Sequence, residues 1–164
     1  MKKWFSSMRQ SGWLTHSVRT AIATSVSLLT ARLSKLPDPY WAAVTTIVVM
    51  QSTLGASWDI SKRRIIGTAI GAGTGGLIAS CFQTNAGILA AALLALGILC
   101  GTLRLDPAAY RFAGLTLFIV TLINRGNTPA FIIAFHRFAE VCIGILVALA
   151  LAAVWPAREV TIRK

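Results

Sequence analysis

Residues 65–103 read IIGTAIGAGTGGLIASCFQTNAGILAAALLALGILCGTL and contain no charged side chain. This run is long enough for two membrane-spanning helices, because one such helix needs about 20 apolar residues. The polar residues 83–85 divide the run, so we place a turn there. Four further apolar segments cover residues 17–33, 39–54, 109–124 and 137–155. Because a backbone in lipid must satisfy its hydrogen bonds within each helix, the sequence predicts an all-α integral membrane bundle of six helices.

The composition of the whole chain favours the same environment. Hydrophobic residues make up 55% of the 164 residues and charged residues 13%, and the mean hydropathy is +0.70. A net charge of +11 would suggest a nucleic-acid partner in a soluble protein, but here the basic residues stand at the edges of apolar segments. Basic residues in such places orient a membrane protein. We therefore expect a lipid bilayer as the surroundings and no nucleic-acid partner.

The basic residues also predict an orientation. With the N-terminus in the cytoplasm, twelve Lys and Arg side chains lie inside and four lie outside, namely Arg32, Lys35, Arg125 and Arg137. Positive residues are enriched on the cytoplasmic side of membrane proteins. The bias favours a multi-pass protein of the inner (plasma) membrane with both termini in the cytoplasm. A basic turn at residues 62–64 would then lie inside and the uncharged turn at residues 83–85 outside.

A pattern in the first half of the chain returns about seventy residues later. Residues 30–33 followed by Asp38-Pro39 correspond to residues 102–105 followed by Asp106-Pro107. After Arg64, small residues occur at every fourth position and form a stripe along the helix. The same four-residue spacing follows Arg137, where it begins with a glutamate and continues with small residues. The two stripes are Gly67, Gly71, Gly75, Ala79 and Glu140, Gly144, Ala148, Ala152. The sequence therefore predicts one domain of two three-helix repeats, at about residues 14–82 and 86–156, the second inverted relative to the first.

The glycines permit two readings. Residues 71–76 satisfy the G-x-G-x-x-G pattern, but they stand inside an apolar helix rather than between a strand and a helix, which argues against nucleotide binding. Small residues at every fourth position instead form a flat ridge on which another helix can pack closely. We predict such packing for Gly67, Gly71, Gly75 and Gly144. The pattern leaves open whether the ridges pack within one chain or between two copies.

Ionisable residues inside apolar segments indicate a functional site. A charge at the bilayer centre costs roughly 2.5 to 3.5 kcal/mol, so such residues face a bundle interior or a wet cavity. Arg137 and Glu140 share a helix face, which allows them to pair. They either anchor the outer end of the last helix or form an anion contact with a proton-sensitive partner. Arg64 is the counterpart of Arg137 in the first repeat, which predicts basic groups at opposite ends of one anion path.

Other candidates have simpler readings beside the functional one. Tyr40 and Trp41 are typical of an interfacial aromatic belt, although an aromatic substrate could stack on them. Arg19 and Arg111 stand near the starts of helices, where long side chains reach the interface at small cost. No spacing of histidines, cysteines or carboxylates indicates a metal site, a cofactor or an enzyme active site.

Several segments together resemble a known family. They are PYWAA at residues 39–43, VVMQ at 48–51, RIIGTAIG at 64–71 and RFAE at 137–140. The chain resembles, over nearly its whole length, the fusaric acid resistance protein-like (FUSC) membrane transporter domain, a family that includes aromatic acid exporters. Ser52 stands where that family usually has a proline, which implies a softer break after Gln51.

Two function classes remain. The resemblance implies a membrane transporter or channel for small organic anions, with an aromatic carboxylate exporter as the first case. The alternative is a non-transporting membrane subunit that serves the assembly or stability of a partner. In either case we expect a homo-oligomer, most simply a dimer, because a single six-helix module is small.

Overall fold

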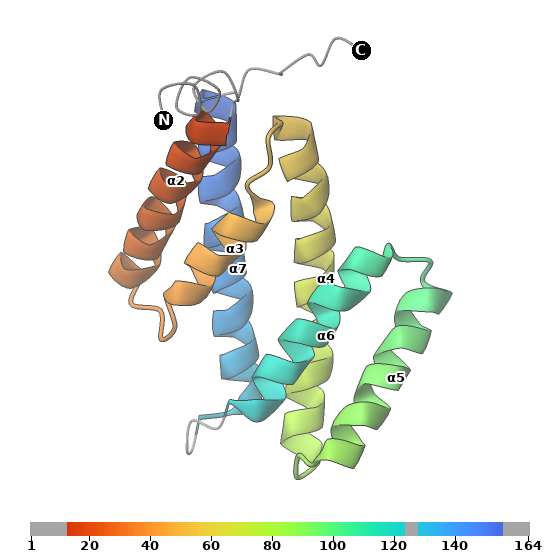
Figure 1. Ribbon diagram of the computed structural model, residues 1–164. Helices are drawn as coiled ribbons and strands as arrows, with labels where there is room; N and C mark the ends of the chain where they lie inside the picture. The colour runs from red at the N-terminus through yellow and green to blue at the C-terminus, as the bar shows by residue number, and fades with distance from the viewer. Residues whose placement is uncertain (1–12, 124–127, 156–164) are drawn as a thin grey trace, which may run out of the picture. The chain divides into compact units, whose positions relative to one another are not determined.

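The computed structural model describes residues 13–123 and 128–155. Within these residues every regular element is an α-helix, as predicted, and the helices follow the order of the apolar segments (Figure 1). They are α2 (Trp13–Leu33), α3 (Tyr40–Val49), α4 (Leu54–Cys81), α5 (Ala86–Thr102), α6 (Pro107–Leu122) and α7 (Ala130–Val154). Seven basic residues used to predict the orientation lie outside the described residues: Lys2, Lys3, Arg9, Arg125, Arg158, Arg163 and Lys164.

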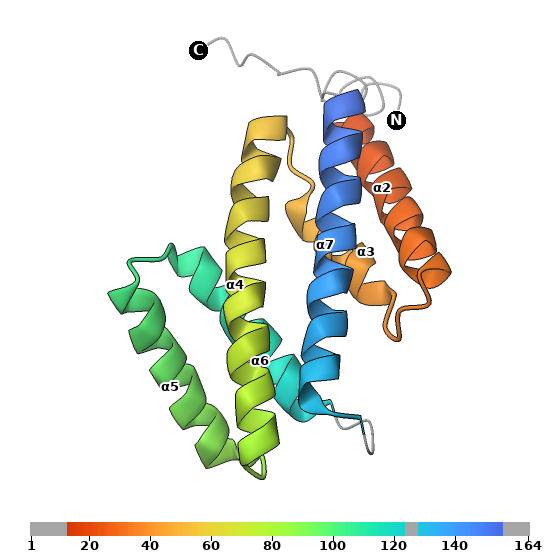
Figure 2. The same cartoon turned by 180° about the vertical axis from the view of Figure 1, so that it is seen from behind.

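The helices form two compact units. Unit 1 comprises Met1–Ile60 and Ile143–Lys164, and unit 2 comprises Ser61–Cys142. In unit 1, α2 packs against α3, and in unit 2, α5 packs against α6 (Figures 1 and 2). Helices α4 and α7 each begin in one unit and end in the other. Each unit therefore holds the first two helices of one sequence repeat, together with a part of α4 and a part of α7.

The first helix of each repeat ends in the same turn. Lys35 after α2 and Arg104 after α5 have positive φ angles of 53° and 52°. In both turns this residue donates its N–H three residues back, and the next residue donates five residues back. This is the hydrogen-bond pattern of a Schellman motif. The sequence comparison of residues 30–33 with 102–105 aligns Arg104 with Arg32, whereas the turns align Arg104 with Lys35. The alignment of the two segments is therefore corrected by three residues, because it is the helix ends that correspond.

The second helix of each repeat also ends alike. Met50 after α3 has φ −67° and ψ 104°, and Ile123 after α6 has φ −73° and ψ 101°. Each donates its N–H to the carbonyl four residues back, at 2.9 Å and 3.0 Å. Helix α3 is fully interrupted at this point, so the softer break expected after Gln51 is not found. Hydroxyl groups take the place of a proline there, since Ser57 Oγ accepts from the Gln51 N–H.

Two predicted boundaries are wrong. Residues 62–64 form no turn but lie inside α4, because Lys and Arg are good helix formers and neither glycine nor proline occurs among residues 56–66. The last helix begins at Ala130 rather than at Arg137. The carbonyl of Pro129 accepts the N–H groups of Ile132 and Ile133 at its start. Arg137 and Glu140 therefore lie within α7, so they do not anchor its end.

The helices differ in their fitness to cross a membrane. By length and composition, α7 with 25 residues is long and apolar enough, and no other helix of the described part passes that test. Helices α3, α5 and α6 are apolar but shorter, with 10, 17 and 16 residues. At about 1.5 Å per residue, α3 covers about half of a bilayer core. Six spans therefore stay a prediction.

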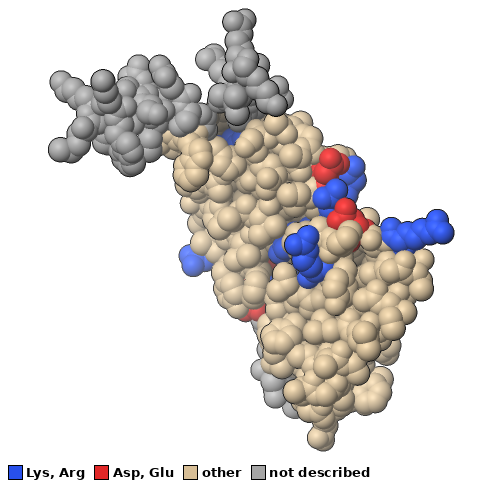
Figure 3. Space-filling model, turned by 45° about the vertical axis from the view of Figure 1, so that its right-hand side comes forward, with Lys and Arg blue, Asp and Glu red and all other residues tan. Residues whose placement is uncertain are grey.

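The surface is unusually apolar for a protein in water. Large side chains are exposed along several helices, including Leu94 and Ile98 of α5 and Phe135 and Leu146 of α7. On the face shown in Figure 3, charged side chains gather in a few places and most of the surface is uncharged. Extended exposed apolar surface marks a contact with lipid or with another protein.

Candidate functional site

Three charged side chains lie together inside unit 2. Arg137 Nη1 donates to Glu140 Oε2 at 2.7 Å, and these side chains are 4% and 2% exposed. Arg64, on α4, is 8% exposed, and its positive charge repels that of Arg137. Both arginines lie in unit 2, where their charges act on each other, so we treat them as one site rather than as the opposite ends of a path. We call Arg64, Arg137 and Glu140 the charged cluster.

An aromatic ring completes the surroundings of Arg64. The guanidinium carbon lies 4.8 Å from the centre of the Phe112 ring of α6. A cation over an aromatic face is attracted by the ring quadrupole, and the attraction grows when water is excluded. Phe112 thus favours a charged Arg64 at the start of the uncharged part of α4.

The charged cluster holds two cationic groups and one carboxylate. Burying charges costs free energy that only good pairing recovers, and a buried ion pair is weak evidence of a stabilising role. The three side chains together carry a formal charge of +1, which attracts a negative group.

Glycines bring α4 close to α6 next to the cluster. A Cβ added to Gly67 would meet Ala109 O and Phe112, and one added to Gly71 would meet the backbone of Ala113. A Cβ on Gly75 would lie 3.1 Å from Leu117 Cα. The ridge of α4 thus packs on α6 of the same chain. Without side chains between them, the two backbones approach closely enough to set Arg64 over Phe112.

The same kind of contact occurs in unit 1 between α7 and α3. A Cβ on Gly144 would meet Ala42 O and the side chain of Thr45. Beside it, the Thr46 hydroxyl lies 3.1 Å from Gly144 O and 2.9 Å from Ala42 O, so it bridges the two helices. In both units, a glycine of a third helix packs on the second helix of the other repeat.

Tyr40 and Trp41 belong to unit 1 and form a separate group. Their ring centres are 5.5 Å apart and their planes are inclined by 41°. Tyr40 is 51% exposed, whereas Trp41 is half-buried. The structure does not bring them together with the charged cluster in one unit.

Arg19 has a role that the sequence did not indicate. It is buried in unit 1, where Nη1 donates to Trp155 O at 2.8 Å and Nη2 donates to Gln51 O. Gln51 follows α3 and Trp155 follows α7, so one guanidinium binds carbonyls at two helix C-termini. The expectation that Arg19 reaches a lipid interface is wrong. Its carbonyl partners come from distant parts of the chain, which no local pattern announces. Arg111 is exposed.

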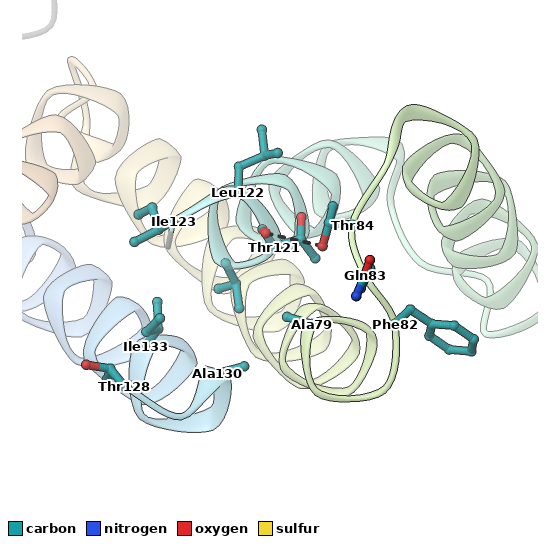
Figure 4. Close-up of a pocket in the computed structure, with 11 residues that line it drawn as sticks. Ala79, Phe82, Gln83, Thr84, Thr121, Leu122, Ile123, Thr128, Ala130 and Ile133 are labelled. Carbon is teal, nitrogen blue, oxygen red and sulfur yellow. Dashed lines mark hydrogen bonds between the residues drawn. The ribbon is translucent and has the colours of Figure 1, made fainter. Parts of the chain in front are cut away.

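A cavity of about 520 Å³ lies at the ends of α4 and α6 in unit 2 (Figure 4). Thr84 Oγ1 donates to Thr121 O across one side of it, at 3.5 Å. Phe82 and Gln83 border it after α4, and Ile123 borders it after α6. No motif in the sequence points to this cavity, because it forms where two helices end.

Comparison with known proteins decides the family. The model of the fusaric acid resistance protein-like family matches residues 22–151. The chain belongs to the fusaric acid resistance protein-like family. Over 149 residues it is 29% identical to the inner membrane protein YeeA of Escherichia coli (strain K12). The aligned residues cover 88% of this chain and 42% of that protein. The chain thus spans less than half the length of this relative. No solved structure matches it.

Membership of this transporter family and the inner-membrane relative place the chain in a membrane. The range that matches the fusaric acid resistance protein-like family contains the whole charged cluster and both glycine contacts. Arg19 and Trp155 lie outside it. The family comparison therefore covers the charged cluster.

Proposed function

We propose that this chain moves small organic anions across the membrane and that the charged cluster is where the anion binds. The single observation that carries the proposal is a pair of buried arginines in unit 2, one on α4 and one on α7, with a buried carboxylate bonded to the second. Charges in such places are costly and mark substrate or ion pathways. An excess of guanidinium groups selects anions, as rings of arginine do in anion pores.

The chemistry of the cluster favours a carboxylate, and an aromatic one in particular. A guanidinium group binds a carboxylate through two parallel N–H bonds. Phe112 already lies against Arg64, so its ring is in reach of an aromatic group attached to that carboxylate. Glu140 accepts a hydrogen bond from Arg137 and lowers the net positive charge of the cluster. Tyr40 and Trp41 would serve as interfacial aromatics, with substrate stacking as their second role.

The similarity of the two repeats, of which we propose that the second is inverted, supports the transport proposal. The matching turns after α2 and α5, the matching ends of α3 and α6, and the matching glycine contacts all relate one repeat to the other. Transporters built from inverted repeats carry their substrate sites where the repeats meet. A homo-oligomer is also proposed, although the glycine ridge packs on α6 of its own chain and so does not argue for it.

Flux into liposomes tests the proposal. Purified protein in liposomes should admit a labelled aromatic carboxylate faster than protein-free liposomes, an aliphatic carboxylate more slowly, and an aromatic ammonium compound no faster than the control. The reason is that two arginines attract carboxylates and repel ammonium groups. Protein that inserts and folds but admits no organic anion would contradict transport and would favour a subunit that stabilises a partner.

A further inference from the structure

Exposed basic side chains gather at one end of unit 2. Arg104 stands in the turn between α5 and α6, and Arg111 lies in the second turn of α6. Lys62 of α4 lies at the same end, because the next residue, Arg63, contacts Asp106 at the start of α6, with Nε 3.3 Å from Oδ2. We call Lys62, Arg104 and Arg111 the basic surface.

Acidic groups do little to offset the charge of this surface. Asp106 and Glu140 are the only acids among residues 61–142. Glu140 is buried and bonded to Arg137. Asp106 faces Arg63, and its Oδ1 accepts the N–H of Ala108 at 2.8 Å. Arg63 and Asp106 cancel in formal charge, so the three side chains of the basic surface give this end of unit 2 a positive potential that attracts anions.

An exposed apolar row continues from the basic surface along α6. Leu115, Phe118 and Leu122 follow Arg111 at spacings of four, three and four residues, and all three are exposed. Residues at this spacing share one face of a helix. No charged residue follows Arg111 as far as the end of α6. One face of α6 therefore carries a cationic group at one end and apolar side chains along the rest.

The neighbouring helices repeat this arrangement. On α5, the exposed side chains of Leu94 and Ile98 come before the exposed Arg104. On α4, the exposed Ile66 lies one turn after Lys62. All three helices thus have their basic residue at the same end of unit 2 and exposed apolar residues away from it. Figure 3 shows charged side chains gathered on parts of one face, with uncharged surface beyond them.

We propose that the basic surface binds the phosphate group of an anionic phospholipid, whose acyl chains lie along the exposed apolar side chains of α5 and α6. The chain lies in a membrane, where such lipids are at hand, and basic residues at a membrane surface attract anionic lipids. A soluble phosphate would use the charges alone and leave the apolar rows uncovered. The proposal goes beyond anion transport, because none of its residues belongs to the charged cluster.

Native mass spectrometry of the purified protein, titrated with lipid in detergent, tests the surface. Dioleoylphosphatidylglycerol and dioleoylphosphatidylcholine have the same acyl chains and differ in the charge of the headgroup. The wild type should bind the first about tenfold or more tightly than the second, since several basic residues act together. Equal affinity of the wild type for the two lipids would overturn the proposal.

Two variants locate the binding. The Arg104→Gln, Arg111→Gln double variant should lose most of the preference for phosphatidylglycerol. The Arg104→Lys, Arg111→Lys double variant is the matched control, because it changes the same positions but keeps both charges, and it should retain the preference. An undiminished preference in a well-folded glutamine variant would place the lipid elsewhere and refute the basic surface.

Competition with inorganic phosphate separates a lipid site from a site for any anion. Excess phosphate at constant ionic strength should leave bound phosphatidylglycerol in place, because phosphate gains nothing from the apolar rows. Displacement of the lipid would overturn the proposal in favour of a simple anion site. This measurement needs only the wild type, so it decides the matter even if the glutamine variant does not fold. Aromatic carboxylate flux in liposomes is measured separately, so either proposal can fail without the other.

Discussion

Gly71 and Gly73 lie in the same helix but have different surroundings. A Cβ on Gly71 would overlap the backbone of Ala113, whereas nothing lies within 4 Å of a Cβ on Gly73. The sequence distinguishes them, because Gly71 belongs to the four-residue stripe and Gly73 does not. At this scale the spacing of small residues predicts which glycines pack. It leaves open which helix covers them, since α6 is remote in sequence.

Gly71→Ala should destabilise the protein by about 1 to 3 kcal/mol, since an added methyl group at a packed site forces backbone to move. Gly73→Ala should be neutral or stabilise by up to about 1 kcal/mol, because alanine favours the helix and no atom obstructs it. Thermal unfolding of both variants in the same detergent gives the comparison. Equal melting temperatures would show that α4 and α6 do not pack as described.

The sequence predicts the helices better than it predicts what lies at their ends. The apolar runs predict all six helices of the described part, since uninterrupted hydrophobic segments admit few other structures in lipid. The sequence misplaces the start of α4, because the break at residues 50–53 rests on hydroxyl groups rather than on proline or glycine. It also misses the Arg19 contacts and the cavity. Both arise where helices distant in sequence end next to each other.

Arg19→Met should loosen the ends of α3 and α7. The variant keeps an unbranched apolar side chain but leaves Gln51 O and Trp155 O without their charged donor, and each such bond is worth about 1.5 to 3 kcal/mol. Arg32→Met, in the last turn of the same helix and exposed, should unfold at the wild-type temperature. A melting temperature of Arg19→Met equal to that of Arg32→Met would contradict the proposed role of Arg19.

For the whole molecule, the distribution of basic residues predicts an orientation in the membrane that stays to be tested. The corrected helix bounds change the test sites, because Ser61 lies buried within α4 and is unsuitable for labelling. Ser52 and Gln83 are exposed and stand before and after α4. They report on the two ends of one helix, and the sequence predicts Ser52 on the cytoplasmic side and Gln83 outside.

In a variant whose Cys81, Cys100 and Cys142 are replaced by serine or alanine, Gln83→Cys should react with an impermeant thiol reagent added to intact cells. Ser52→Cys should react only after the membrane is opened, because α4 separates the two positions. Labelling of both cysteines from the same side would contradict a membrane crossing by α4. Labelling from the two sides in the opposite sense would reverse the orientation.

Residues of two helices, α4 and α7, form the charged cluster, and the transport proposal depends on it. The decisive measurement is the flux of a labelled aromatic carboxylate per inserted molecule, in liposomes, for the Arg64→Gln, Arg137→Gln double variant. Arg63→Gln is the matched control, because Arg63 neighbours Arg64 but is 45% exposed and pairs with Asp106 at 3.3 Å. The double variant should lose about tenfold or more, since one hydrogen bond to a charged group is worth about 1.5 to 3 kcal/mol. The control should transport as the wild type does. Wild-type flux in a well-folded double variant would contradict an anion site at Arg64 and Arg137.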